Sequence, residues 1–185
     1  MIPEKIKTIR EFVGVTELQV SSTINVNSYK YKRSEGNDDY ISTEMLILLS
    51  IIYKLPFEKI WSVDYSVENI LESEYLNSIS KLEPEQVVEC FKDNLCSYFE
   101  KKRRKANYGT IKLILKKEMK TLGRNIKEIR ENKKLQITDV ASMLKIDEST
   151  YKSFESGSVF PSPMQILCLT DKFNVSIVKL INIKK

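Results

Sequence analysis

The sequence predicts an all-α protein in which two copies of a small helical domain are joined by a helical segment. Apolar residues recur at spacings of three and four, with no strand-like alternation. Short segments are bounded by residues that favour helix starts and stops. The chain also aligns with itself at an offset of 120 residues. These observations divide it into residues 1–62, 63–120 and 121–185.

The internal repeat is the most informative of these features. At the offset of 120, residues 6–62 lie on residues 126–182 without a gap, and 13 of the 57 pairs are identical. The first five identities form the shared pattern I-K-x-I-R-E, which starts at Ile6 and at Ile126. Apolar positions between the identities correspond as well, for example Ile24 with Leu144. Such agreement over an ungapped stretch predicts two copies of one domain.

The second copy shows the expected helices most clearly. The first is expected over residues 122–132 and the next around residues 140–144, because their apolar residues fall on one helical face. Asp147 is a good N-cap for a third helix, which Gly157 would end. "PSPMQILCLTDKF" predicts a fourth helix with Cys168 in the core, and residues 177–181 a short fifth.

The middle segment carries two further helical patterns. "SVENILESEYLNSIS" predicts one helix, and "EPEQVVECFKDNLCSYFEKKRRK" predicts another with an apolar stripe. The stripe could pack on the same chain or form a homodimer through the middle helices, with Cys90 and Cys96 as packing residues. A break is expected at residues 106–109, followed by one long helix that runs into the second copy and is weakly interrupted at Gly123. The stripe comprises Val87, Val88, Phe91, Leu95, Tyr98 and Phe99.

Composition excludes several classes of function. There is no histidine and no glycine-rich phosphate loop, which argues against an enzyme, a metal site or a cofactor. The three cysteines form no C-x-x-C pair and, with no apolar signal core at the N-terminus, predict a cytoplasmic protein. The longest apolar run, Met45 to Tyr53, is too short to span a membrane.

Charge is distributed unevenly along the chain. The net charge is +5, with a pI near 8.9. Residues 63–100 contain nine acidic and two basic residues, whereas residues 101–120 contain nine basic and one acidic. The densest basic cluster is "KKRRK", residues 101–105. A mildly basic protein with such a cluster is compatible with a polyanionic partner.

The second copy resembles the Cro/C1-type (XRE) helix-turn-helix domains of phage and bacterial repressors. "LQITDVASMLKIDESTYKSFESGSVFPS" fits the family pattern without gaps, and "VTELQVSSTINVNSYKYKRSEG" fits it more loosely. The resemblance implies two lambda-repressor-like five-helix domains and a transcriptional regulator, with repression favoured, that binds specific double-stranded DNA sequences. It also suggests an origin in a mobile element. The matching positions in the second copy are Val140, Ala141, Leu144, Ile146, Glu155, Gly157 and Pro161.

The resemblance also implies which residues contact DNA. The third helix of each copy would lie in the major groove, with its N-terminal residues at base edges. Arg33 suits guanine, because its planar fork can bond O6 and N7 together. The charge of residues 101–105, and not the resemblance, predicts further phosphate contacts through Lys101, Lys102, Arg103, Arg104 and Lys105, with a solvated helix end as the alternative. The other positions are Thr16, Ser28, Tyr29, Lys30 and Lys32 in the first copy, and Gln136, Glu148, Ser149, Thr150, Lys152 and Ser153 in the second.

Two departures from the family pattern keep an alternative open. The family usually has Thr-Gln at the start of the second helix, but the copies have Thr16-Glu17 and Gln136-Ile137. Glu148 also opposes the phosphate field. The alternative is therefore a protein-interaction module, an antagonist or adaptor that binds a protein partner. The basic third helix of the first copy favours DNA, and we expect that copy to be the stronger reader.

Overall fold

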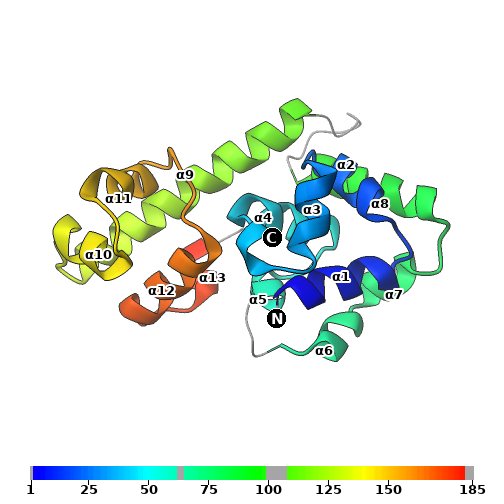
Figure 1. The fold of residues 1–185 in the computed structure, drawn as a ribbon, viewed down its shortest axis with the longest axis horizontal. Helices are drawn as coiled ribbons and strands as arrows, with labels where there is room; N and C mark the ends of the chain where they lie inside the picture. The colour runs from blue at the N-terminus through cyan, green and yellow to red at the C-terminus, as the bar shows by residue number, and fades with distance from the viewer. Residues whose placement is uncertain (1, 62–64, 99–107, 182–185) are drawn as a thin grey trace. The chain divides into compact units, whose positions relative to one another are not determined.

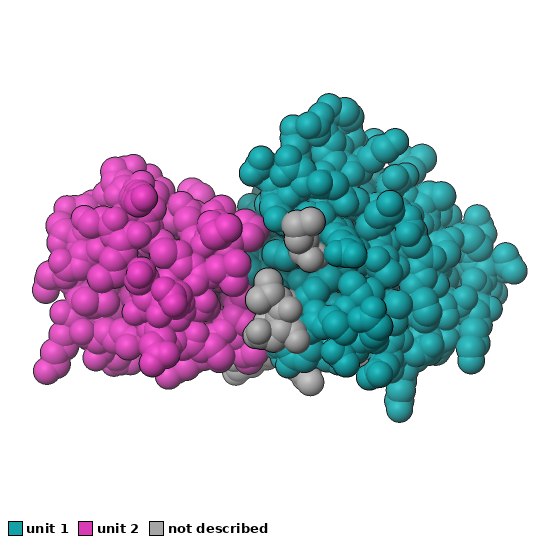
Figure 2. All heavy atoms as spheres, turned by 60° about the horizontal axis from the view of Figure 1, so that its bottom comes forward, with its two compact units in different colours: residues 1–114 teal, residues 115–185 magenta. Residues whose placement is uncertain are grey.

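The computed structural model describes residues 2–61, 65–98 and 108–181, and the regular elements in these ranges are all helices (Figure 1). The chain divides into two compact units, residues 1–114 and residues 115–185 (Figure 2). None of the described helices combines the length and the apolar character that crossing a membrane requires. The cluster at residues 101–105 lies outside the described residues.

Unit 1 begins with helices whose starts are fixed by side-chain caps. Thr16 accepts a hydrogen bond from the Gln19 amide (3.2 Å), and Asn27 accepts one from the Lys30 amide (3.1 Å). Each cap satisfies an amide that has no partner inside the helix. The helices are α1 (Ile2–Phe12), α2 (Glu17–Thr23), α3 (Ser28–Ser34), the 3₁₀ turn η1 (Asp38–Tyr40), α4 (Thr43–Ile52), α5 (Phe57–Trp61), α6 (Val67–Leu71), α7 (Glu74–Ile79) and α8 (Pro84–Ser97).

The apolar stripe of the middle segment packs inside unit 1. Helix α8 contacts both α4 and α2. Its residues Val87, Phe91 and Leu95 are fully buried. The Phe91 ring meets the Tyr53 ring edge-on at 5.3 Å between centroids, and the Asn94 amide donates to a backbone carbonyl of α4 at 2.7 Å. The stripe thus follows the intramolecular alternative, and it explains why α4 is buried on nearly every side.

The segment predicted as one helix over residues 66–80 forms two, α6 and α7. The Asn77 side-chain amide donates to the carbonyl of Leu71 (2.9 Å), so the end of α6 is satisfied without continuing the helix. In one continuous helix Ile70 and Leu76 would point about 120° apart. The break allows both side chains to be fully buried.

Unit 2 contains residues 115–132 of one long helix, whose first seven residues belong to unit 1. Helix α9 (Tyr108–Asn132) runs without interruption through Gly123, and it begins inside the predicted break at residues 106–109. The expected break at Tyr108 and Gly109 is therefore wrong, because both residues are helical. The remaining helices are α10 (Ile137–Leu144), α11 (Glu148–Glu155), α12 (Pro163–Phe173) and α13 (Ile177–Ile181).

Gly123 marks a close approach of two helices and not a weak point in one. A Cβ atom at Gly123 would lie 2.4 Å from the carbonyl oxygen of Phe154, at the end of α11. Gly157 follows α11 with φ of +66°, and a Cβ there would lie 2.7 Å from the Cα of Lys120. The left-handed conformation and the tight space both favour glycine at Gly157. The two glycines therefore bring α11 directly against the backbone of α9.

Replacing Gly123 with alanine is expected to destabilise unit 2. Alanine would gain about 1 kcal/mol of helix propensity, but the clash is with backbone that cannot rotate away. Overpacking of this kind costs about 1–3 kcal/mol, so the net effect is a loss of stability. Gly36→Ala is the control, because its Cβ would meet only one atom, at 3.9 Å. Urea unfolding followed by circular dichroism measures both. Equal stability of the two variants would contradict the close approach.

Cys168 is less buried than predicted. Its counterpart at the offset of 120, Leu48, is only 1% exposed, whereas Cys168 is partly exposed. Leu48 lies on α4, which α8 covers in unit 1. Within unit 2 the described residues provide no helix in the position of α8. Met143 is consequently 39% exposed, while its counterpart Thr23 is 8% exposed.

Candidate nucleic-acid interface

Helices α10 and α11 form a helix-turn-helix with one face of α11 open to solvent. Between them Lys145 adopts a left-handed conformation (φ +54°), which ends α10 and turns the chain. Val140 and Ala141 on α10 are buried, as are Tyr151 and Phe154 on α11. Because the apolar side of α11 faces inward, its opposite side is exposed. The exposed residues of α11 are Glu148, Ser149 and Lys152.

The N-terminus of α11 is organised by Asp147. Its carboxylate accepts hydrogen bonds from the Thr150 amide (2.8 Å), the Thr150 hydroxyl (2.7 Å) and the Ser149 hydroxyl. These bonds hold the pKa of Asp147 well below its ordinary value, with the Ser149 bond as the largest cause. Asp147 is thus a cap, as predicted. Ser149 and Thr150 donate to it and are not free to donate elsewhere in this conformation.

A buried ion pair holds α11 against α9. Arg130 donates to both carboxylate oxygens of Glu155, at 2.5 and 3.1 Å, and to the carbonyl of Leu135 at 3.0 Å. The two side chains are 10% and 8% exposed. The hydrogen bond to Glu155 is the main cause that raises the pKa of Arg130. The pair therefore fixes both the end of α11 and the turn before α10.

The predicted contact residues of unit 2 lie around the N-termini of α10 and α11. Glu148 pairs with Lys152 at 3.4 Å, so their charges largely compensate each other. Ser153 is partly buried and donates to the carbonyl of Ser149 (3.0 Å). Gln136 is exposed at the N-cap of α10, where its backbone amide donates to the Asp139 carboxylate (2.8 Å). The exposed face of α11 is therefore polar and close to neutral.

Unit 1 contains the same local arrangement at α2 and α3. Asn25 takes the left-handed conformation (φ +54°) between the helices, and Asn27 caps α3. Arg10 donates to both carboxylate oxygens of Glu35, at 2.6 and 2.8 Å, and to the carbonyl of Val15 at 3.1 Å. Each of these five residues is 120 positions before its counterpart in unit 2.

The exposed face of α3 carries the predicted cations together with an arrangement that the sequence did not predict. Arg33 donates to the Tyr29 hydroxyl (2.9 Å), and its guanidinium lies 4.4 Å from the ring centroid of Tyr40. The hydrogen bond that Arg33 donates to Tyr29 is the main cause that raises the pKa of Arg33. Tyr40 lies in η1, outside any helical pattern that could have placed it near Arg33. Ser28, Tyr29, Lys30, Lys32 and Arg33 are all exposed.

The elements that precede and follow α3 in the sequence carry acidic residues. Glu17 begins α2 directly after Thr16, where the family has glutamine, and Asp38 and Asp39 are exposed in η1. Thr16 itself is engaged with Gln19 in a reciprocal capping arrangement. Both α2 and η1 contact α3, so the elements around its three cations carry three carboxylates, which weakens the attraction of this region for phosphate.

Comparison with known proteins supports one part of this arrangement. Residues 123–184 match the model of a helix-turn-helix domain family. No curated protein and no solved structure matches the chain. The matched residues include α10, α11 and the Arg130–Glu155 pair described above. Residues 123–184 therefore form an XRE-type helix-turn-helix domain.

Proposed function

We propose that this protein is a transcriptional regulator that binds specific sequences of double-stranded DNA through two helix-turn-helix domains. The observation that carries the proposal is the exposed α11, presented by a helix-turn-helix that the family model matches. In such domains the second helix of the motif enters the major groove. Bound at a promoter, a chain of this size would exclude polymerase, so repression is the role we favour.

The second domain of the proposal is residues 1–62. It is supported by the shared contacts at the offset of 120: the Arg–Glu pair, its bond to the turn carbonyl, the left-handed residue and the capped third helix. Two tethered domains could occupy two half-sites, because binding of one raises the effective concentration of the other. Such a chain would not need a dimer to read both half-sites. Analytical ultracentrifugation with and without DNA would measure its stoichiometry.

A protein-interaction module is the second candidate function. The observation that favours it is the balance of charge, because α11 is close to neutral and α3 has carboxylates nearby. A salt titration of binding to a random-sequence duplex separates the two functions. Several phosphate contacts would give a steep linear decrease of log K with log salt, about 0.9 per contact. Absent or salt-insensitive binding would exclude the DNA-binding function.

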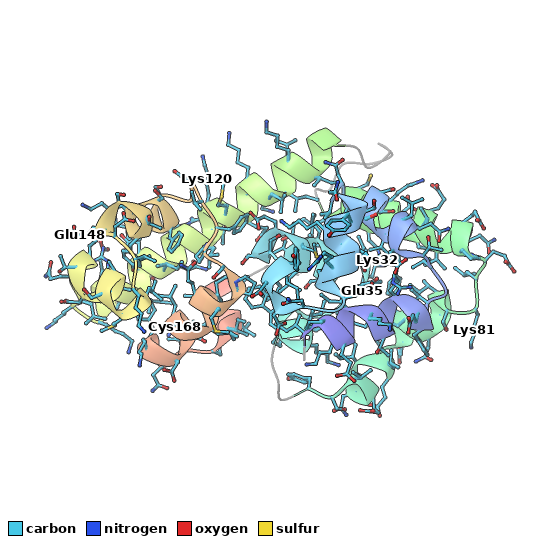
Figure 3. All side chains as sticks on the ribbon, in the orientation of Figure 1. Lys32, Glu35, Lys81, Lys120, Glu148 and Cys168 are labelled. Atoms are coloured by element: carbon cyan, nitrogen blue, oxygen red, sulfur yellow. The ribbon has the colours of Figure 1, made fainter. Side chains whose placement is uncertain are left out.

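Neutralising the three cations of α3 is expected to weaken DNA binding. In the variant K30Q/K32Q/R33Q, up to three phosphate or base contacts are lost, which predicts a loss on the order of 100-fold near physiological salt. The matched control K54Q/K81Q/K92Q removes the same charge away from α3, and Figure 3 shows Lys32 and Lys81 on different parts of unit 1. Fluorescence anisotropy measures both affinities. Equal affinities for variant and control would exclude α3 as a DNA-contacting helix.

A further inference from the structure

Helix α9 carries a row of cations beside α11. Lys116, Lys120 and Arg124 follow one another at four-residue spacing, and Lys117 lies in the adjacent position. At 3.6 residues per turn these four side chains fall within an arc of about 100°. All four are exposed. We call this set, Lys116, Lys117, Lys120 and Arg124, the α9 basic row.

No acidic residue between Lys116 and Arg124 lies on the side of α9 that carries the basic row. Glu118, the one carboxylate between Lys116 and Lys127, is 4% exposed and belongs to the opposite, buried side together with Leu122. Among the described residues, Lys116, Lys120 and Arg124 form no ion pair at 4.0 Å or less. The row ends where Lys127 pairs with Glu131 at 3.9 Å.

The position of the row follows from the two glycines. Gly123 lies about 60° around α9 from Lys120 and abuts the last turn of α11, and the backbone of Lys120 abuts Gly157. Figure 3 shows Lys120 on the part of α9 that lies beside α11. The row therefore borders the C-terminal end of the helix whose N-terminal end would read DNA. In unit 1 the counterpart of Arg124 is Glu4, so this position of the row carries the opposite charge there.

We propose that the α9 basic row binds the phosphate backbone of the DNA that α11 enters. The proposal rests on the proposed function and supplies what α11 lacks, since α11 itself is close to neutral and can contribute little electrostatic affinity. Phosphate contacts of this kind position a protein on the duplex but carry no base preference. The row thus provides affinity and register, and α11 provides the contacts to bases.

The test is the variant K116Q/K120Q/R124Q. Its matched control is K133Q/K172Q/K179Q, which removes the same charge from exposed positions elsewhere in unit 2. Affinity for a random-sequence duplex and for a duplex enriched by selection is measured from about 0.05 to 0.3 M salt, together with urea unfolding. We expect the row variant to lose on the order of 100-fold in affinity near 0.15 M, with a salt slope smaller by about 2–3 and the control unchanged.

The remaining outcomes overturn the proposal in distinguishable ways. If the wild-type protein binds DNA and the row variant retains the affinity and slope of the control, the row does not contact phosphate. If the row variant binds the random duplex normally but no longer prefers the selected one, the row acts in base reading. If the wild-type protein binds neither duplex, the proposed function fails and this inference fails with it. A drop in urea stability that accounts for the lost binding assigns the row to folding instead.

Discussion

Replacing Glu155 with alanine is expected to lower the free energy of unfolding of unit 2 by about 3–5 kcal/mol. The physical reason is the charge that remains. Arg130 is 9% exposed and donates two hydrogen bonds to Glu155, so the variant leaves a buried guanidinium whose remaining carboxylate is the exposed Glu131, 3.5 Å away. Arginine cannot escape this cost by losing its proton, because a guanidinium stays protonated in proteins. Urea unfolding followed by circular dichroism measures the change.

The double variant R130M/E155L distinguishes two quantities. One is the penalty of burying an unpaired guanidinium, and the other is the net contribution of the Arg130–Glu155 pair to the free energy of unfolding. Removing both charges avoids the unpaired guanidinium, so we expect a smaller loss than in Glu155→Ala alone. The loss should not vanish, because the carbonyl of Leu135 also loses its donor (3.0 Å). Glu131→Ala is the surface control, since its carboxylate is 54% exposed and its pairs should contribute little. If the Glu155→Ala variant is as stable as this control, the Arg130–Glu155 pair does not stabilise unit 2.

The same pair shows how much the repeat could predict. Arginine at positions 10 and 130 and glutamate at positions 35 and 155 are identities at the offset of 120, but the offset gives no reason for them. The structure supplies the reason, since each pair joins the first helix to the third in its half of the chain. The alignment could place residues in helices because apolar spacing is local. It could not pair charges that are 25 residues apart.

Other features depended on contacts that no local pattern contains. The apolar stripe of α8 was visible in the sequence. Whether it packs on its own chain or on another depends on whether the fold leaves one side of α4 uncovered, which no local pattern shows. Gly123 looked like a weak point because helix propensity considers only the helix that contains the residue. Its actual role, to allow the backbone of α11 to approach α9, depends on a neighbouring helix. Cys168 looked buried because its counterpart is leucine, but α8 covers only the first of the two positions.

The local features of the candidate interface could also be predicted from the sequence, whereas its contacts between elements could not. The repeat and the family pattern predicted helices α3 and α11, their caps at Asn27 and Asp147, and their exposed residues. The position of Tyr40 against Arg33 did not, because a short 3₁₀ turn brings them together. The α9 basic row could have been found from its four-residue spacing. Its position beside α11 required the two glycine contacts.

Replacing Phe91 with alanine is expected to destabilise unit 1 by about 3–5 kcal/mol, the range for truncating a fully buried phenylalanine. Phe91 is 0% exposed, and it packs edge-on against Tyr53 at 5.3 Å. The loss should be at the high end if the cavity cannot collapse, because α4 is already packed on its other sides. Trp61, the only tryptophan, is buried in unit 1, so its fluorescence reports the unfolding of this unit.

Val88→Ala is the matched control for Phe91→Ala, since Val88 lies on the same helix but is only partly buried. It should change stability by less than about 1 kcal/mol, because the lost contacts are few and alanine favours the helix. If Phe91→Ala unfolds unit 1 no earlier than this control, α8 is not part of the core. In that case its stripe would be available to another chain, and the homodimer that the sequence left open would become the better account of residues 84–97.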